Sequence, residues 1–201
     1  MKAFIIEVIE DARDKQQALK SAPIQIVTKG ILSENDGTPA LQRALKWYRE
    51  NIKNGRVYNT VKGKILIDEQ SIRSTMAHKY GPEKLDAITS LFTGFDNAVY
   101  LTDMEDYDDH SLVYSYFVYP IQYDGELGYC LCRTRLKSDI GAKHRLYIHE
   151  VFSDKYIKNF TYQAAADEGH RVRGKVLYSN LLKQVIDYKD SNTQTKSNEE
   201  Q

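Results

Sequence analysis

Residues 111–136 constrain the fold most, because they read as two strands joined by one tight turn. Apolar and polar side chains alternate in "SLVYSYFVYPIQY" and again in "ELGYCLCRTRL", and Asp124-Gly125 separates the two runs. An Asp-Gly pair suits the positive backbone angles of a two-residue hairpin turn. We therefore predict an antiparallel hairpin centred on this pair, in which Tyr119 lies opposite Cys130.

This register divides the hairpin into two faces of different chemistry. The first face sets small thiols against aromatic rings and suits packing under helices; it carries Ser115, Phe117, Tyr119, Cys130 and Cys132. The second face carries tyrosines and two arginines, namely Tyr114, Tyr116, Tyr129, Arg133 and Arg135. Such side chains could stack on bases and grip a phosphate, or they could only cover apolar neighbours. The sequence leaves both interpretations open.

Helical patterns precede the hairpin, and another strand lies on each side of it. "AVYLT" and "HRLYIHEVF" have the period of strands, and a capped helix is expected from Ser179 onward. The sequence thus predicts an α+β domain over residues 57–190, with N-terminal helices packed on a four-stranded antiparallel β-meander and a C-terminal helix. Residues 1–56 are predicted to form an N-terminal helical extension, and residues 191–201 a disordered tail.

Charge and cysteine content exclude several classes of protein. The 28 basic and 28 acidic residues give a net charge of +0, which argues against a protein that coats nucleic acid nonspecifically. Cys130 and Cys132 are the only thiols, and no second Cys pair or Cys/His cluster accompanies them. We therefore expect no disulfide framework, no metal site and no cofactor.

Two further segments, one acidic and one apolar, lack the features of a calcium site, a signal sequence or a membrane span. The acidic stretch "TDMEDYDDH" lacks the glycine and the distant glutamate of a calcium-binding loop, so it is expected to be a solvated connection. The apolar run in "MKAFIIEVIEDARD" is too short for a signal sequence or a membrane span. A cytoplasmic location and no membrane partner are the expectation.

Polar side chains recur along the helix predicted in "SIRSTMAHKYGPEKLDAITSLF". Ser71, Thr75 and His78 share one side of this helix, and Lys84 follows in a second helix that begins at Pro82. The opposite side of both helices is apolar. The polar side is therefore either a solvated stripe or one wall of a functional site.

Five stretches in this order give the chain a family resemblance: "GKILIDEQSIRSTMAHKYGPEKLDAITSL", "NAVYL", "VYSYFVYPIQYDGELGYCLCRTR", "RLYIHEV" and "SNLLKQVIDY". They resemble the large polyvalent protein-associated domain of the third class, which occurs in polyproteins of phages and conjugative elements. The resemblance covers about residues 57–190 and implies the barnase–EndoU–colicin–RelE-like nuclease fold, with metal-independent endoribonuclease activity. The positions that match the family's polar pattern are Ser71, His78, Lys84, Tyr147 and His149.

The chemistry of RNA cleavage suggests roles for these residues. Cleavage without metal requires a base, an acid and cations that stabilise the phosphorane. Histidine suits proton transfer near neutral pH, so we assign His78 and His149 as the acid/base pair. Phosphate contacts are assigned to Lys84 together with Arg133 or Arg135. Ser71 joins the two histidines as a catalytic candidate, with its hydroxyl or that of Thr75 positioning the substrate, and Tyr147 is expected to bind the substrate.

Two classes of function follow from the sequence. The first is a toxin-like ribonuclease of a phage or mobile element, whose partners would be RNA and an immunity protein. The second is a catalytically inactive interaction module on the same scaffold, which binds a phage or host protein. The first class requires the histidines and arginines to converge, so His78 and His149 on opposite sides of the sheet would exclude the proposed pair.

Overall fold

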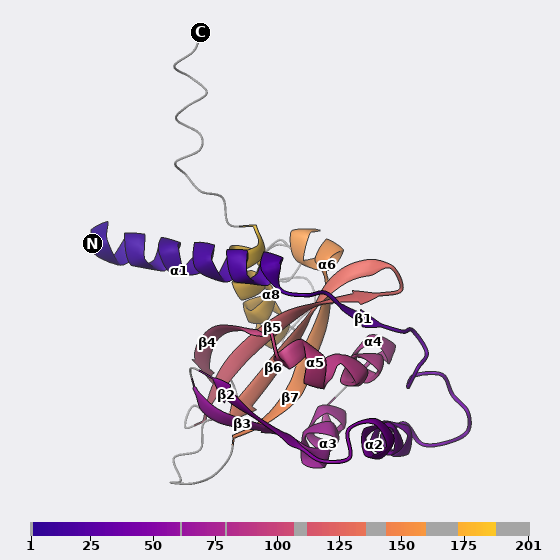
Figure 1. Ribbon diagram of the computed structural model, residues 1–201. Coiled ribbons are helices and arrows are strands. Elements are labelled where there is room, and N and C mark those ends of the chain that lie inside the picture. Colours follow the sequence, from indigo (N-terminus) through magenta and orange to yellow (C-terminus); the bar gives the residue numbers. More distant parts are fainter. Residues whose placement is uncertain are drawn as a thin grey trace. The chain divides into compact units, whose positions relative to one another are not determined.

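The computed structural model describes residues 2–60, 62–78, 80–106, 112–135, 144–159 and 173–187 (Figure 1). The chain forms two compact units. The larger unit is Ala22–Tyr156, and the smaller unit combines Met1–Ser21 with Ile157–Gln201. The predicted tail, residues 191–201, lies outside the described residues.

Two helices from the two ends of the chain lie against each other in the smaller unit. They are α1 (Lys2–Ser21) and α8 (Arg173–Ile186). The side-chain amide of Gln16 donates a hydrogen bond to the carbonyl oxygen of Ile186 at 2.8 Å. Helix α8 begins six residues before Ser179, the residue predicted to cap it. The side chain of Ser179 is buried and lies inside the helix, not at its N-terminus. A short helix, α6 (Asp154–Asn159), leads from the larger unit into the smaller one.

A single seven-stranded sheet forms the frame of the larger unit. The strands follow the order β1-β5-β6-β7-β3-β2, and β4 also pairs with β5. Their bounds are β1 (Gln25–Val27), β2 (Arg56–Thr60), β3 (Gly63–Ile67), β4 (Val99–Glu105), β5 (Val113–Tyr123), β6 (Glu126–Arg135) and β7 (His144–Ser153).

The α+β class is confirmed, but the predicted four-stranded antiparallel meander does not match this sheet. β4, β5, β6 and β7 pair antiparallel in succession, whereas β1 runs parallel to β5 and β3 runs parallel to β7. The sheet is therefore mixed and larger than expected. The added strands β1, β2 and β3 are only three to five residues long, so they carry too few alternations to reveal their pairing in the sequence.

The central hairpin has the predicted register. Tyr119 lies opposite Cys130 and Phe117 lies opposite Cys132. The turn is made by Asp124 and Gly125, with φ values of 53° and 80°. These angles are those of the turn that an Asp-Gly pair favours.

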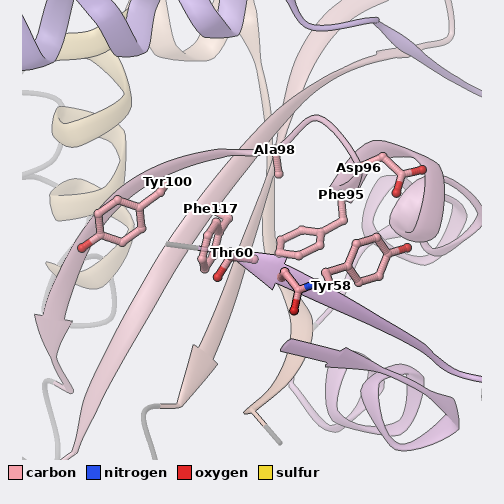
Figure 2. A pocket seen from close by; sticks show the side chains of 8 residues that line it. Tyr58, Thr60, Phe95, Asp96, Ala98, Tyr100 and Phe117 are labelled. Carbon is pink, nitrogen blue, oxygen red and sulfur yellow. The ribbon is translucent and has the colours of Figure 1, made fainter. Parts of the chain in front are cut away.

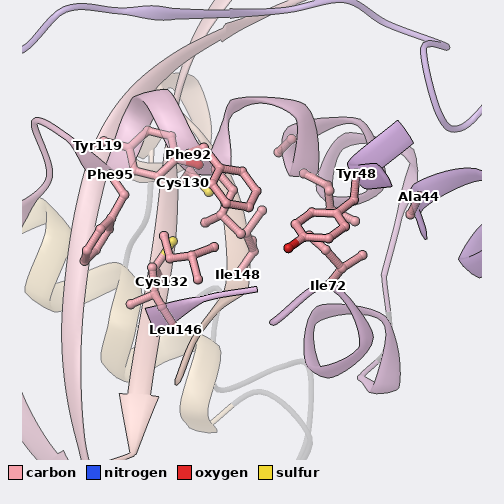
Figure 3. Packing of buried hydrophobic residues seen from close by; sticks show 14 of the residues in the cluster. Ala44, Tyr48, Ile72, Phe92, Phe95, Tyr119, Cys130, Cys132, Leu146 and Ile148 are labelled. Atoms are coloured by element: carbon pink, nitrogen blue, oxygen red, sulfur yellow. The ribbon is translucent and has the colours of Figure 1, made fainter. Parts of the chain in front are cut away.

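Helices cover the first face of the hairpin, as the sequence predicts (Figure 3). They are α2 (Ala40–Asn51), α3 (Glu69–Ala77), α4 (Pro82–Asp86), η1 (Ala87–Ser90) and α5 (Leu91–Phe95). Their apolar sides and the sheet form one core that includes Tyr48, Ile72, Phe92, Phe95, Phe117, Tyr119, Cys130, Cys132, Leu146 and Ile148. Both cysteines are buried and reduced. No helix in the described part of the chain is long and apolar enough to cross a membrane.

Candidate functional site

Strand β7 contains a bulge next to the central hairpin. Leu131 lies opposite Glu150, and the next residue of β6, Cys132, lies opposite Ile148. His149 is therefore an extra residue in β7. Because directly opposed residues share a face, Glu150 lies on the face of Leu131 and Ile148 on the face of Cys132. A bulge of this kind re-aims side chains, and bulges are common beside functional sites.

Arg133 lies at the centre of the second face. It is opposite Tyr116 of β5 and Tyr147 of β7. Its Nε donates a hydrogen bond to the phenolic oxygen of Tyr147, and its guanidinium carbon is 4.3 Å from the ring centroid of Tyr114. Its Nη1 lies 3.5 Å from Oδ2 of Asp106, just after β4. These contacts hold a guanidinium in a site where the residue is only 8% exposed.

The two candidate histidines reach the same side of the sheet from different elements. His78 caps the C-terminus of α3, and its ring stacks on Tyr147 with centroids 5.5 Å apart. His149, in the bulge of β7, meets the ring of Tyr116 edge-on at 6.1 Å. Because Tyr116 and Tyr147 both flank Arg133, both histidines lie on its side of the sheet. The histidines therefore do not lie on opposite sides of the sheet, which is the arrangement that would exclude them as an acid/base pair.

Lys84 of α4 completes this group. Its side chain is buried, and its charge acts on both histidines together with that of Arg133. We call His78, Lys84, Arg133, Tyr147 and His149 the Arg133 cluster. The sequence proposed all five residues, and the fold brings them together from α3, α4, β6 and β7.

Burial and positive charge keep both histidines neutral. Burial lowers the pKa of His149 to about 2, and the charges of Arg133, Lys84 and His78 act in the same direction. His78 is exposed, but partial desolvation of its ring lowers its pKa too, again with Arg133 and Lys84, while the carboxylate of Asp106 opposes the shift. Both imidazoles are therefore uncharged at pH 7 in the free protein.

The other members of the Arg133 cluster are also perturbed by burial. Burial lowers the pKa of Lys84, and the carboxylate of Glu150 partly offsets this. Burial raises the pKa of Tyr147 to about 12, although Arg133 opposes the shift. For Arg133, burial disfavours the charge, but the phenolic oxygens of Tyr147 and Tyr116 outweigh it and raise the pKa. Titratable groups whose pKa is perturbed by burial and by specific charge partners are candidates for a functional site.

The fold itself uses the two candidate hydroxyls. Ser71 forms a capping box with Asp68, because the N–H of each residue donates to the side-chain oxygen of the other at 3.1 Å. The Thr75 hydroxyl donates to the carbonyl oxygen of Ser71 and accepts from the N–H of Ile148, each at 3.0 Å. Both residues are fully buried. Arg135, in contrast, is exposed at the end of β6, opposite Tyr114.

The sequence did not indicate two charged neighbours of the Arg133 cluster, Asp106 and Glu150. Asp106 belongs to the acidic stretch that the sequence indicated as a solvated connection, yet it pairs with Arg133. Strict alternation along β7 would put Glu150 on the face opposite to Tyr147, but the bulge puts both residues on the same face. No signal in the sequence marked the bulge. Within the described ranges, no group of three or more His, Cys, Asp or Glu side chains is arranged to hold a metal ion.

Comparison with known proteins identifies a matching family. No curated protein and no solved structure matches the chain. The model of the family described as large polyvalent protein-associated domain 3 matches residues 38–145, more than half of the sequence. The matched segment contains Lys84 and Arg133 and ends two residues before Tyr147. The chain therefore belongs to the large polyvalent protein-associated domain 3 family.

Proposed function

We propose that this protein is a metal-independent endoribonuclease of a phage or other mobile element, and that the Arg133 cluster is its active site. The observation that carries the proposal is that two histidines meet the tyrosines beside Arg133, and that the charges of the buried Arg133 and Lys84 both act on these histidines. Lys84 and Arg133 both carry positive charge next to the histidines, and a phosphodiester anion is a group that these two charges together would attract.

The neutral imidazole of His78 suits the role of base. Its residue is exposed, whereas His149 is less accessible and its Nδ1 is buried. In the proposed reaction His78 takes the proton of the ribose 2′-hydroxyl, and the 2′-oxygen then bonds to phosphorus. The bond from phosphorus to the 5′-oxygen breaks, which leaves a 2′,3′-cyclic phosphate. Arg133 and Lys84 stabilise the negative charge that develops on the phosphoryl oxygens.

The departing 5′-oxygen must receive a proton, and His149 is the proposed donor. Its pKa of about 2 in the free protein results from burial and from the nearby cations. A bound phosphodiester would add a negative charge that counters Lys84 and Arg133, and this would favour the protonated form of His149 against the effect of burial. Substrate binding is thus part of the proposed mechanism, because the bound anion is what favours the proton that His149 donates.

Substrate contacts follow from the same geometry. Tyr147 orients Arg133 by accepting its Nε–H and stacks on His78, so it positions both groups. Arg135 lies two residues further along β6 and could hold the next phosphate of a single strand. Ser71 and Thr75 are engaged by the fold, so we assign them supporting roles instead of direct substrate contact.

The test is cleavage of a fluorescently labelled single-stranded RNA in the presence of EDTA, with mass spectrometry of the products. The wild-type protein should give 2′,3′-cyclic phosphate ends. His78→Asn should lower the rate about 100-fold or more, because general base catalysis contributes that much. Arg133→Gln should weaken both binding and cleavage. The matched control is Arg73→Gln, since Arg73 is an exposed arginine of α3 that pairs with Glu69 outside the cluster.

A catalytically inactive binding module is the second candidate. The specific observation in its favour is that both histidine pKa values are lowered, so neither imidazole holds a proton at pH 7 in the free protein. RNA binding that depends on Arg133, without any cleavage between pH 5 and 8, would select this candidate. An intact RNA that also fails to bind would reject an RNA function, and a phage or host protein would then be the partner to seek.

A further inference from the structure

A pocket lies apart from the Arg133 cluster, between β2 and β4 (Figure 2). Its volume is about 340 Å³. The lining residues come from β2, from the end of α5 and from β4 and β5; they are Tyr58, Asn59, Thr60, Phe95, Asp96, Ala98, Tyr100 and Phe117. None of them belongs to the Arg133 cluster, so nothing in the proposed ribonuclease function accounts for this pocket.

Four aromatic rings form a continuous wall of the pocket. The ring of Phe95 meets that of Tyr58 edge-on, with centroids 5.1 Å apart, and that of Phe117 at 5.2 Å. Phe117 in turn meets Tyr100 at 5.6 Å. The hydroxyl of Tyr58 donates to the carbonyl oxygen of Phe92 at 2.8 Å, which fixes the orientation of this ring. The aromatic wall is therefore preorganised by packing.

The charge of the pocket favours a cation. Its one carboxylate is the exposed side chain of Asp96. Burial, the largest cause, raises the pKa of Tyr58; the hydrogen bond with the exposed Arg56, which is not among the lining residues, lowers it, and the charge of Asp96 raises it. No lysine, arginine or histidine lines it. The Nζ of Lys62 already lies 4.7 Å from the ring centroid of Tyr100, so this aromatic face accepts a cation within the fold, and Asp103 neutralises that lysine at 2.6 Å. Aromatic faces beside a carboxylate attract cations and repel phosphates.

The edge of the sheet at this pocket can accept another strand. Among the described strands, β2 pairs only with β3, so the backbone groups along its other edge have no strand partner. Tyr58, Asn59 and Thr60 of this edge strand line the pocket. An extended peptide added to an open edge gains backbone hydrogen bonds, and alternate side chains of that peptide enter pockets beside the edge.

We propose that the pocket binds an arginine side chain from an extended segment of a partner protein, which adds to the sheet along the free edge of β2. Arginine fits better than lysine, because its planar guanidinium stacks on aromatic faces and makes a forked contact with a carboxylate. Phe95 and Phe117 form the floor, and Asp96 pairs with the guanidinium at the mouth. The site is independent of the proposed cleavage of RNA.

Binding of a fluorescein-labelled heptapeptide, measured by fluorescence anisotropy, tests the proposal. The peptide alternates threonine and valine around a central arginine. A control peptide has citrulline at the central position, because citrulline has the shape of arginine but no charge. The arginine peptide should bind about tenfold more tightly, since cation–π and carboxylate contacts together contribute about that factor. Asp96→Asn should remove this preference for the arginine peptide. The control Glu126→Gln also removes one exposed negative charge, but outside the pocket, so this variant should still prefer the arginine peptide.

Two results would overturn the proposal. Equal binding of the arginine and citrulline peptides would show that the pocket does not recognise the cation. Unchanged preference in Asp96→Asn would place the arginine elsewhere on the protein. A third peptide, N-methylated on the residues beside the arginine, tests the pairing with β2: it should bind less tightly, and equal affinity would exclude strand addition.

Discussion

The hydroxyl of Thr75 accepts a hydrogen bond from the backbone N–H of Ile148, so a helix side chain completes the hydrogen bonding of a strand. Strand β7 pairs with β3 only at His144 and Arg145, which leaves later N–H groups on that edge in need of other partners. Helix α3 lies along this edge and supplies one. The contact also holds the C-terminal end of α3, and with it His78, beside Tyr147.

Thr75→Val tests this contact. Valine has nearly the same shape but offers no acceptor, so the N–H of Ile148 would be buried without a partner. We expect the free energy of unfolding to fall by about 1–3 kcal/mol, measured by urea denaturation. Thr75→Ser keeps the oxygen and should lose less. A stable Thr75→Val protein with weakened RNA binding would instead assign Thr75 to the substrate.

Asp86 is expected to be the most sensitive polar residue of the core. Its fully buried carboxylate accepts hydrogen bonds from the N–H groups of Gly30, Leu32 and Ser33 and from the hydroxyls of Ser33 and Tyr123. Asp86→Ala leaves these donors unsatisfied, and the free energy of unfolding should fall by about 3 kcal/mol or more. Ser33→Ala removes one donor and should cost about 1 kcal/mol. Similar losses for the two variants would contradict this account.

Gly94 is required because the ring of Tyr119 occupies the space of a side chain. A Cβ at this position would lie 2.3 Å from Cε2 of Tyr119. In an exposed helix, alanine in place of glycine stabilises by about 1 kcal/mol, but here overpacking should destabilise by about 1–3 kcal/mol. At Gly81 the single close atom is the flexible end of Glu83, so Gly81→Ala should have a small effect. Thermal unfolding of both variants gives the sign.

Because the pKa values of both histidines in the Arg133 cluster are lowered by folding, we expect the folded protein to lose stability in acid. The pKa of His149 is about 2 in the folded protein and about 6.5 in an unfolded chain. Between these values the unfolded state binds more protons, so stability is full above about pH 6.5 and decreases as the pH falls towards 2. The lowered pKa of His78 acts in the same direction.

His149→Gln should reduce this pH dependence, because glutamine is polar but does not titrate. The measurement is the urea midpoint from pH 7 to pH 4, with NMR titration of the histidine ring protons as a direct readout. A titration of His149 near pH 6.5 in the free protein would contradict the environment described for it. Titration that shifts upward when a phosphodiester is added would support its proposed role as proton donor.

Local pattern was sufficient to predict the central hairpin. The alternation of side chains and the Asp124-Gly125 turn fixed the pairing of Tyr119 with Cys130, because a two-residue turn leaves one register. The same pattern separated the face under the helices from the face with Arg133. The residues of the Arg133 cluster could likewise be proposed from residue type and family resemblance.

The bulge at His149 and the edge contact of Thr75 depend on the tertiary structure. An alternating pattern has a period of two residues and contains no record of an inserted residue, so alternation alone would put Glu150 on the wrong face. The partner of a strand edge depends on groups distant in sequence, as the bond from Ile148 to Thr75 does. The sequence by itself determined which side chains alternate and where the chain turns. Only the tertiary structure decided which of them meet at Arg133, because hydrogen bonds between distant segments set that geometry.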